Sequence, residues 1–119
     1  NLASRLGSKA FREDYKIQYS YLAGAMYRGI ASKELVISMA KANMLGFLGT
    51  GGMSLEEIES DILYIKRALN AGGSYGMNLL HNIIDPILEM KTVELFLKHE
   101  ISNIEAAAFM QITKPLVYY

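Results

Sequence analysis

Residues 45–80 read LGFLGTGGMSLEEIESDILYIKRALNAGGSYGMNLL, and their pattern predicts a strand, a helix and a second strand. The apolar run Leu45–Leu48 indicates a buried strand, because it stops at a glycine-rich loop. Ser54 and Glu57 have the spacing of a capping box at a helix N-terminus. Apolar residues then recur at steps of three and four: Leu55, Ile58, Ile62, Ile65 and Leu69. A second apolar run, Tyr75–Leu80, predicts the strand that follows.

The same alternation continues on both sides of this unit. Upstream, Ile17–Ala25 is rich in aromatic and branched residues, as strands are, and a serine-capped helix is expected over Ser32–Ala42. Downstream, Asp85 followed by proline predicts another helix N-terminus. A fourth strand is predicted over Ile101–Phe109. We expect the inner face of the last helix to contain Met90, Val93 and Leu97.

Four strands alternating with helices define an α/β fold. The predicted strands begin near Gln18, Leu45, Ser74 and Ser102, at nearly even intervals. This order implies parallel strands joined by right-handed crossovers. Since a complete (β/α)8 TIM barrel has about 250 residues, a chain of 119 residues would form about half of one. The alternative is an open doubly wound sheet, in which the helices would cover both faces and not one.

Composition narrows the function classes. Hydrophobic residues make up 51% of the chain and charged residues 20%, which is enough apolar material for a packed domain. Twelve basic and twelve acidic residues cancel, which argues against nucleic acid or an anionic membrane as partner. The chain has no cysteine, so disulfides and thiolate metal sites are excluded and the cytoplasm is the default location. It lacks an initiator methionine, and we expect it to be part of a longer protein.

Two loops at predicted strand ends have little side chain, and ligands in parallel α/β folds bind at these ends. Ala23-Gly24-Ala25-Met26 would expose backbone donors and acceptors to a flat ring, or it would simply pack closely at a tight turn. Gly49-Thr50-Gly51-Gly52 resembles a phosphate loop. However, a dinucleotide fingerprint needs glycine where Ser54 stands, so a turn that leads into the helix is the simpler interpretation.

Polar residues near the last two strand ends are the other candidates. Asn78 is a primary amide inside an apolar strand, and it would need either a ligand with an imide-like edge or neighbouring backbone as its partner. Glu105, among alanines, must also meet a partner or water. His81 is a weak candidate for proton transfer, and Gln111 is a still weaker site residue. The sequence contains no motif of a hydrolase or of a metal site.

Three longer stretches carry a family resemblance: residues 21–59 (YLAGAMYRGIASKELVISMAKANMLGFLGTGGMSLEEIE), 75–82 (YGMNLLHN) and 91–119 (KTVELFLKHEISNIEAAAFMQITKPLVYY). The combination of GAMYRGIAS with GMNLLHN is its most specific part. Together they resemble the N-terminal half of the catalytic barrel of trans-acting enoyl reductases from bacterial polyunsaturated fatty acid and polyketide synthases. These enzymes belong with the nitronate monooxygenase (2-nitropropane dioxygenase) group of flavoenzymes.

The resemblance implies an FMN-binding (β/α)8 barrel, of which residues 1–119 would be the first four βα units. NAD(P)H would reduce the flavin, which would then reduce an enoyl thioester carried by acyl carrier protein. By position, the family's cofactor contacts correspond to Ala23, Gly24, Ala25, Met26 and Asn78, with Glu105 and Gln111 at the floor or rim. Gly49, Thr50, Gly51 and Gly52 would border the substrate mouth.

The resemblance also leaves alternatives open. The family holds the FMN phosphate on later strands, so the fragment alone is expected to be inactive. A half-barrel would also expose its edges and inner face, and the missing C-terminal half or another copy of the chain is expected to cover them. A nitronate-oxidising enzyme on the same scaffold and a non-catalytic half-barrel module are the two other interpretations.

Overall fold

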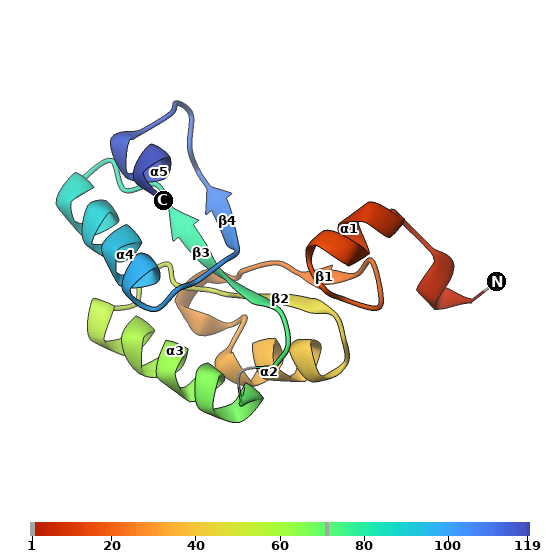
Figure 1. Cartoon of the computed structure of the whole chain (residues 1–119). Helices are drawn as coiled ribbons and strands as arrows, with labels where there is room; N and C mark the ends of the chain where they lie inside the picture. The colour runs from red at the N-terminus through yellow and green to blue at the C-terminus, as the bar shows by residue number, and fades with distance from the viewer. Residues whose placement is uncertain (1, 71) are drawn as a thin grey trace.

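The computed structural model describes residues 2–70 and 72–119, and its central feature is a four-stranded parallel sheet (Figure 1). The strands lie in chain order, β1-β2-β3-β4, and each pairs in parallel with the next. Their bounds are β1 Leu22–Ala23, β2 Leu45–Leu48, β3 Tyr75–Leu80 and β4 Ile104–Ala107. Strands in sequential order with parallel pairing are the arrangement of a barrel arc.

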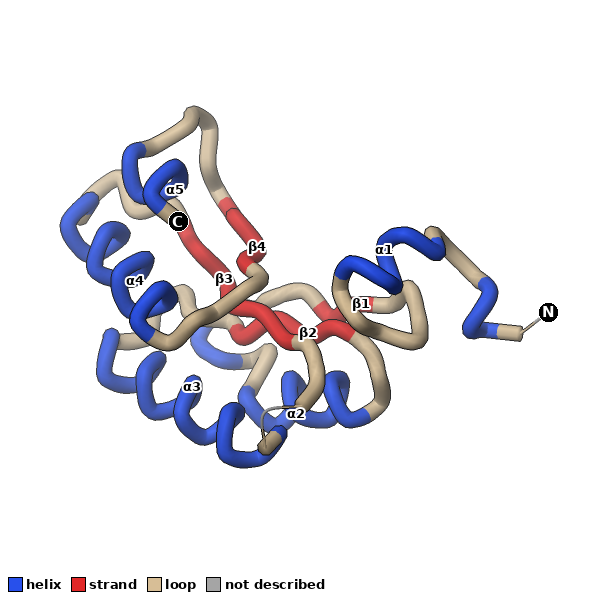
Figure 2. Tube along the Cα trace, in the orientation of Figure 1, coloured by secondary structure: helices blue, strands red, loops and turns tan. Residues whose placement is uncertain are grey.

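Three helices cover one face of this sheet: α2 Lys33–Lys41, α3 Leu55–Leu69 and α4 Pro86–Lys98 (Figures 1 and 2). The opposite face stays open to the interior of the arc. A doubly wound sheet would carry helices on both faces and would reverse its strand order, so that alternative is wrong. The architecture is the N-terminal half of a TIM barrel, as predicted.

The helix boundaries follow from their caps. In α3, the Ser54 hydroxyl accepts a hydrogen bond from Glu57 N at 3.2 Å, and the Glu57 carboxylate accepts one from Ser54 N at 2.7 Å. This confirms the predicted capping box. Ser32 and Asp85 cap α2 and α4 in the same way, by accepting from Leu35 N and Leu88 N. These short-range signals place all three helix N-termini as the sequence predicts.

The first and last strands are shorter than predicted. In the segment Ile17–Ala25, only Leu22 and Ala23 pair with β2, while Ile17 is buried in the core. Strand β4 ends at Ala107 because Ala108 has a φ of +62°, which no continuing strand residue can adopt. The first difference arises from pairing across the sheet and the second from a backbone turn at Ala108, and local residue preference encodes neither.

The buried face of α4 is also different from the prediction. Its buried residues are Glu89, Val93 and Phe96, while Met90 is half-buried and Leu97 is 39% exposed. Val93 is therefore confirmed, but the prediction for Met90 and Leu97 is wrong. The buried face of α4 begins with the carboxylate of Glu89. A search for regularly spaced apolar residues does not detect a charged residue at such a position.

Four short helices were not predicted: η1 Ala3–Arg5, α1 Lys9–Asp14, η2 Tyr27–Gly29 and α5 Lys114–Tyr118. Helix α1 lies beside β1 at the edge of the arc (Figure 1). Phe11 and Tyr15, at this helix, pack on a small apolar cluster of Ile17, Leu45 and Phe47. Among the described residues, no helix has the length and apolar character needed to cross a membrane.

The two faces of the sheet carry different side chains, and this positions the candidate site. Met77 and Leu79 of β3 belong to the main core against the helices. Because side chains alternate along a strand, Asn78 between them faces the interior of the arc. In β4, Ile104 packs on the same helical core, so Glu105 also faces the interior. Asn78 and Glu105 are register partners in the sheet.

Candidate functional site

Hydrogen bonds link the carboxyl ends of all four strands on the interior side. Thr50 Oγ1, after β2, donates to the Asn78 carbonyl at 2.8 Å, and Asn78 Nδ2 donates to the Glu105 carbonyl at 3.0 Å. The Glu105 carboxylate in turn accepts from the backbone N–H of Ala25, after β1, at 2.7 Å. We call Ala25, Thr50, Asn78 and Glu105 the inner-face network. It brings together four of the residues that the sequence singled out.

Asn78 is the central side chain of this network, and it is only 7% exposed. Its contact with the Glu105 carbonyl uses one of its two N–H groups. No described residue donates a hydrogen bond to Oδ1 or accepts one from the second N–H. The two interpretations of Asn78 are therefore compatible, because neighbouring backbone satisfies one donor and the remaining donor and acceptor can serve a ligand.

Glu105 spans the arc from β4 to the loop after β1. Its side chain is half-buried, and its carboxylate lies against Gly24 as well as Ala25. A Cβ atom on Gly24 would lie 3.3 Å from Glu105 Oε1, which is a tight contact. The partner that Glu105 was expected to need is thus the backbone amide of Ala25, which belongs to the loop Ala23–Met26.

The glycine loop after β2 packs against the loop after β1. Gly49 N donates to the Ala31 carbonyl at 3.0 Å, and the Gly49 carbonyl accepts from Gly29 N at 2.9 Å. A Cβ atom on Gly49 would overlap the carbonyl group of Met26. The amide of Gly49 is therefore occupied within the protein, which favours the simpler interpretation of a close-packed turn over an anion site.

A second polar cluster surrounds Glu89, a residue of α4 that the sequence pattern did not single out. The carboxylate is 3% exposed and lies 2.8 Å from His81 Nδ1. It also accepts hydrogen bonds from Asn82 N and from the Thr113 hydroxyl, each at 2.8 Å. Burial alone would raise the pKa of Glu89, but these three contacts together hold it below its usual value.

His81 and Gln111 lie outside the inner-face network. The His81 ring is 12% exposed, bonded to Glu89 and packed 5.0 Å from the ring of Phe109. It lines a cavity of about 500 Å³ together with Gln111, between the loops after β3 and β4. Gln111 is exposed. His81 is thus fixed between the loop after β3 and the loop after β4 by its contacts with Glu89 and Phe109.

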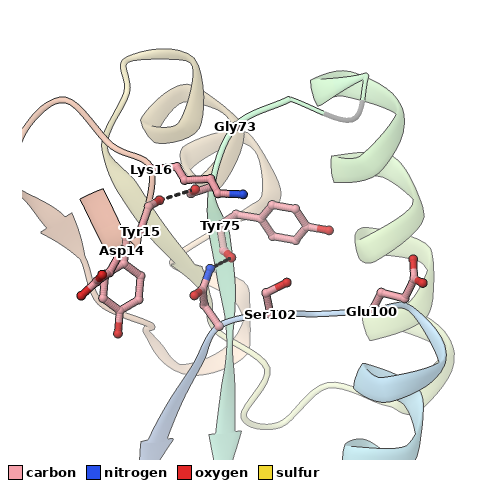
Figure 3. A pocket seen from close by; sticks show the side chains of 9 residues that line it. Asp14, Tyr15, Lys16, Gly73, Tyr75, Glu100 and Ser102 are labelled. Atoms are coloured by element: carbon pink, nitrogen blue, oxygen red, sulfur yellow. Dashed lines mark hydrogen bonds between the residues drawn. The ribbon is translucent and has the colours of Figure 1, made fainter. Parts of the chain in front are cut away.

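A different cavity lies at the opposite end of the sheet (Figure 3). It has a volume of about 370 Å³ and is bordered by residues before β1 and β4 and at the start of β3, among them Tyr15, Lys16, Tyr75 and Ser102. Asn103 Nδ2 donates to the Tyr75 carbonyl there at 3.0 Å, and burial raises the pKa of Tyr75. Since barrel enzymes work at the carboxyl ends of their strands, this cavity is not the candidate site.

The inner face combines small side chains with hydrogen-bonding groups that no described residue uses. Residues Ala23, Gly24 and Ala25 have small side chains or none, and Glu105 connects this loop to Asn78 on β3. Among residues 2–70 and 72–119, no three His, Asp or Glu side chains gather as metal ligands. The unused N–H and Oδ1 of Asn78 can bond a ligand whose edge has an acceptor next to a donor.

No family model matches the chain, but individual relatives do. Among solved structures, the enoyl reductase domain of MlnA from the macrolactin cluster of Bacillus amyloliquefaciens superposes with a TM-score of 0.95 and 45% identity. The match covers 99% of this chain and 27% of that one. The chain is related to this enoyl reductase domain.

Curated relatives agree with this assignment. The polyketide biosynthesis protein PksE of Bacillus subtilis is 49% identical over 117 residues, and a polyunsaturated fatty acid synthase component of Thraustochytrium is 39% identical over 114. The chain spans 15% and 8% of their lengths. A FabK structure from Thermotoga maritima shares the fold at 16% identity, with a TM-score of 0.73. The resemblance to synthase-associated enoyl reductases is thereby confirmed.

Proposed function

We propose that residues 1–119 form the first four βα units of an FMN-dependent enoyl reductase, which uses NAD(P)H to reduce enoyl thioesters on acyl carrier protein. The observation that carries the proposal is the inner-face network, in which Glu105 connects the loop Ala23–Met26 to Asn78 and its free donor and acceptor. The relationship to an enoyl reductase domain supports it.

Each part of the inner face has a task in this proposal. The bound flavin supplies hydride-transfer chemistry that amino-acid side chains lack. Ala23–Met26 offers backbone to one side of the ring, and Asn78 bonds its pyrimidine edge. Glu105 would hold the loop through its bond to Ala25 N, and Thr50 would hold the end of β3 through its bond to the Asn78 carbonyl. Gly51 and Gly52 would border the substrate mouth. The remaining part of the longer protein would complete the barrel and hold the cofactor phosphate.

Two measurements on the longer protein that contains this chain test the proposal. Its visible absorbance after purification should show bound flavin, which NAD(P)H should bleach without oxygen. Adding a crotonyl thioester of acyl carrier protein should then restore the oxidised spectrum and yield the saturated thioester. A protein that binds no flavin would be the non-catalytic module. A flavin that a nitronate reduces, and that oxygen but not the enoyl thioester reoxidises, would identify the nitronate monooxygenase chemistry.

A further inference from the structure

Glu105 has a geometry that differs from that of a cofactor ligand. Its Oε2 atom is 2.7 Å from Ala25 N, and the two residues lie 80 positions apart in the sequence. A carboxylate that accepts a backbone N–H at this distance makes a charge-assisted hydrogen bond, which is stronger than a neutral one. We propose that Glu105 is a positioning residue, whose carboxylate holds the loop Ala23–Met26 in the shape that receives the flavin.

The neighbouring contacts support this role. The Glu105 backbone carbonyl is fixed by Asn78 Nδ2, so the residue is held at its main chain as well as at its carboxylate. Gly24, next to Ala25, has no Cβ that would press on Oε1. Strand β1 contributes only Leu22 and Ala23 to the sheet, so few ladder hydrogen bonds hold the loop that follows. Backbone bonds from Arg28 and Gly29 hold the end of this segment to the glycine loop, and the Glu105 carboxylate holds its beginning at Ala25.

The carboxylate also places negative charge on the inner face. Glu105 faces the interior, and no ion pair joins it to a basic residue in the part of the chain that the structure describes. Negative charge beside a flavin disfavours its anionic reduced form and lowers the reduction potential. The change in reduction potential depends on the negative charge of Glu105, whereas the hydrogen bond to Ala25 N depends only on an acceptor atom. The two roles can be separated by substitution.

Three variants of the longer protein make the test: Glu105→Ala, Glu105→Gln and, as a control, Glu94→Gln. Glutamine keeps an acceptor oxygen and removes the charge, while alanine removes both. Glu94 is an exposed carboxylate on α4, away from the inner face. Thermal unfolding is measured first, so that all readouts come from folded protein.

The first readout is hydrogen exchange at the Ala25 amide in protein freed of flavin, and it does not depend on the proposed function. Exchange should be about 10-fold to 150-fold faster in Glu105→Ala than in wild type, since the amide loses a charge-assisted hydrogen bond. Glu105→Gln should lie between the two, and Glu94→Gln should match wild type. Unchanged exchange in Glu105→Ala would overturn the inference, whatever the flavin does.

The second readout is the flavin itself, and it rests on the proposed function. Glu105→Ala should bind FMN about 10-fold more weakly or worse, and Glu105→Gln should recover most of that loss. The midpoint potential of the bound flavin should become more positive in Glu105→Gln. Equal weakening in both variants with unchanged Ala25 exchange would make Glu105 a direct ligand and would contradict positioning. If wild type binds no flavin, the proposed function fails while the exchange result still decides the role of Glu105.

Discussion

The carboxylate of Glu89 lies 2.8 Å from Nδ1 of His81 and is almost completely buried between two loops. The same carboxylate accepts from Asn82 N and from Thr113 Oγ1, so it connects the segment after β3 with the segment after β4. Both segments lie at the end of the sheet that carries the inner-face network. Glu89 therefore stabilises the frame around the candidate site without being part of it.

Removing this carboxylate should be costly. Glu89→Ala leaves the donors of His81, Asn82 and Thr113 without their acceptor in a buried place, and we expect a loss of about 2–5 kcal/mol in the free energy of unfolding. Urea unfolding of the purified protein measures it. Glu94→Ala removes an exposed carboxylate from the same helix and should change stability by less than about 0.5 kcal/mol. Equal effects of the two substitutions would contradict the role assigned to Glu89.

The contribution of Glu89 should also depend on pH. Its pKa in the folded protein lies below the unfolded value of 4.5, since the folded state favours the charged form. The stabilisation is therefore fully present above that value and is lost as the pH falls through the lower, folded pKa. The stability difference between wild type and Glu89→Gln should be constant near neutrality and should narrow below about pH 4.5. Melting temperatures from pH 3 to 7 test this, and a gap that widens in acid would contradict it.

The glycine loop gives a prediction about packing. Gly49→Ala places a methyl group onto the backbone carbonyl of Met26, which is not a flexible side chain and cannot move aside cheaply. We expect a loss of about 1–3 kcal/mol in stability. Gly72→Ala is the matched control, because a Cβ there meets only the Leu69 carbonyl at an ordinary 3.4 Å. Thermal denaturation compares the two variants, and a neutral Gly49→Ala would mean that the two loops are not packed as described.

These residues also show what the sequence could and could not predict. The Ser54–Glu57 capping box and the strand Leu45–Leu48 were predictable because their signals are local, and both were confirmed. The inner-face position of Asn78 follows from strand alternation alone. In contrast, the contact between Glu105 and Ala25 joins residues that only the curvature of the sheet brings together.

Glu89 was missed for a related reason. It lies on the buried stripe of α4, where the expected helix face included apolar residues only, and its three partners come from the segments before and after this helix. A carboxylate at the start of a buried helical stripe, four residues before Val93, was the available signal. Its meaning depended on His81 and Thr113, whose positions no local pattern specifies.

The last prediction concerns Asn78 and the flavin. Asn78→Leu preserves the approximate volume of the side chain but removes the N–H and the oxygen that we propose bond the pyrimidine edge. Leaving those flavin groups unpaired should cost about 1–3 kcal/mol, or roughly 5-fold to 150-fold in affinity.

The substitution also removes the hydrogen bond from Asn78 to the Glu105 carbonyl, so a loss of affinity could arise indirectly. Asn103→Leu controls for this, because Asn103, just before β4, makes an equivalent bond to the Tyr75 carbonyl of β3 at the amino ends of the strands. Fluorescence titration with FMN should show weaker binding for Asn78→Leu and near wild-type binding for Asn103→Leu. Equal dissociation constants for Asn78→Leu and wild type would remove Asn78 from the cofactor site, and equal losses in both variants would assign the effect to the joining of β3 and β4.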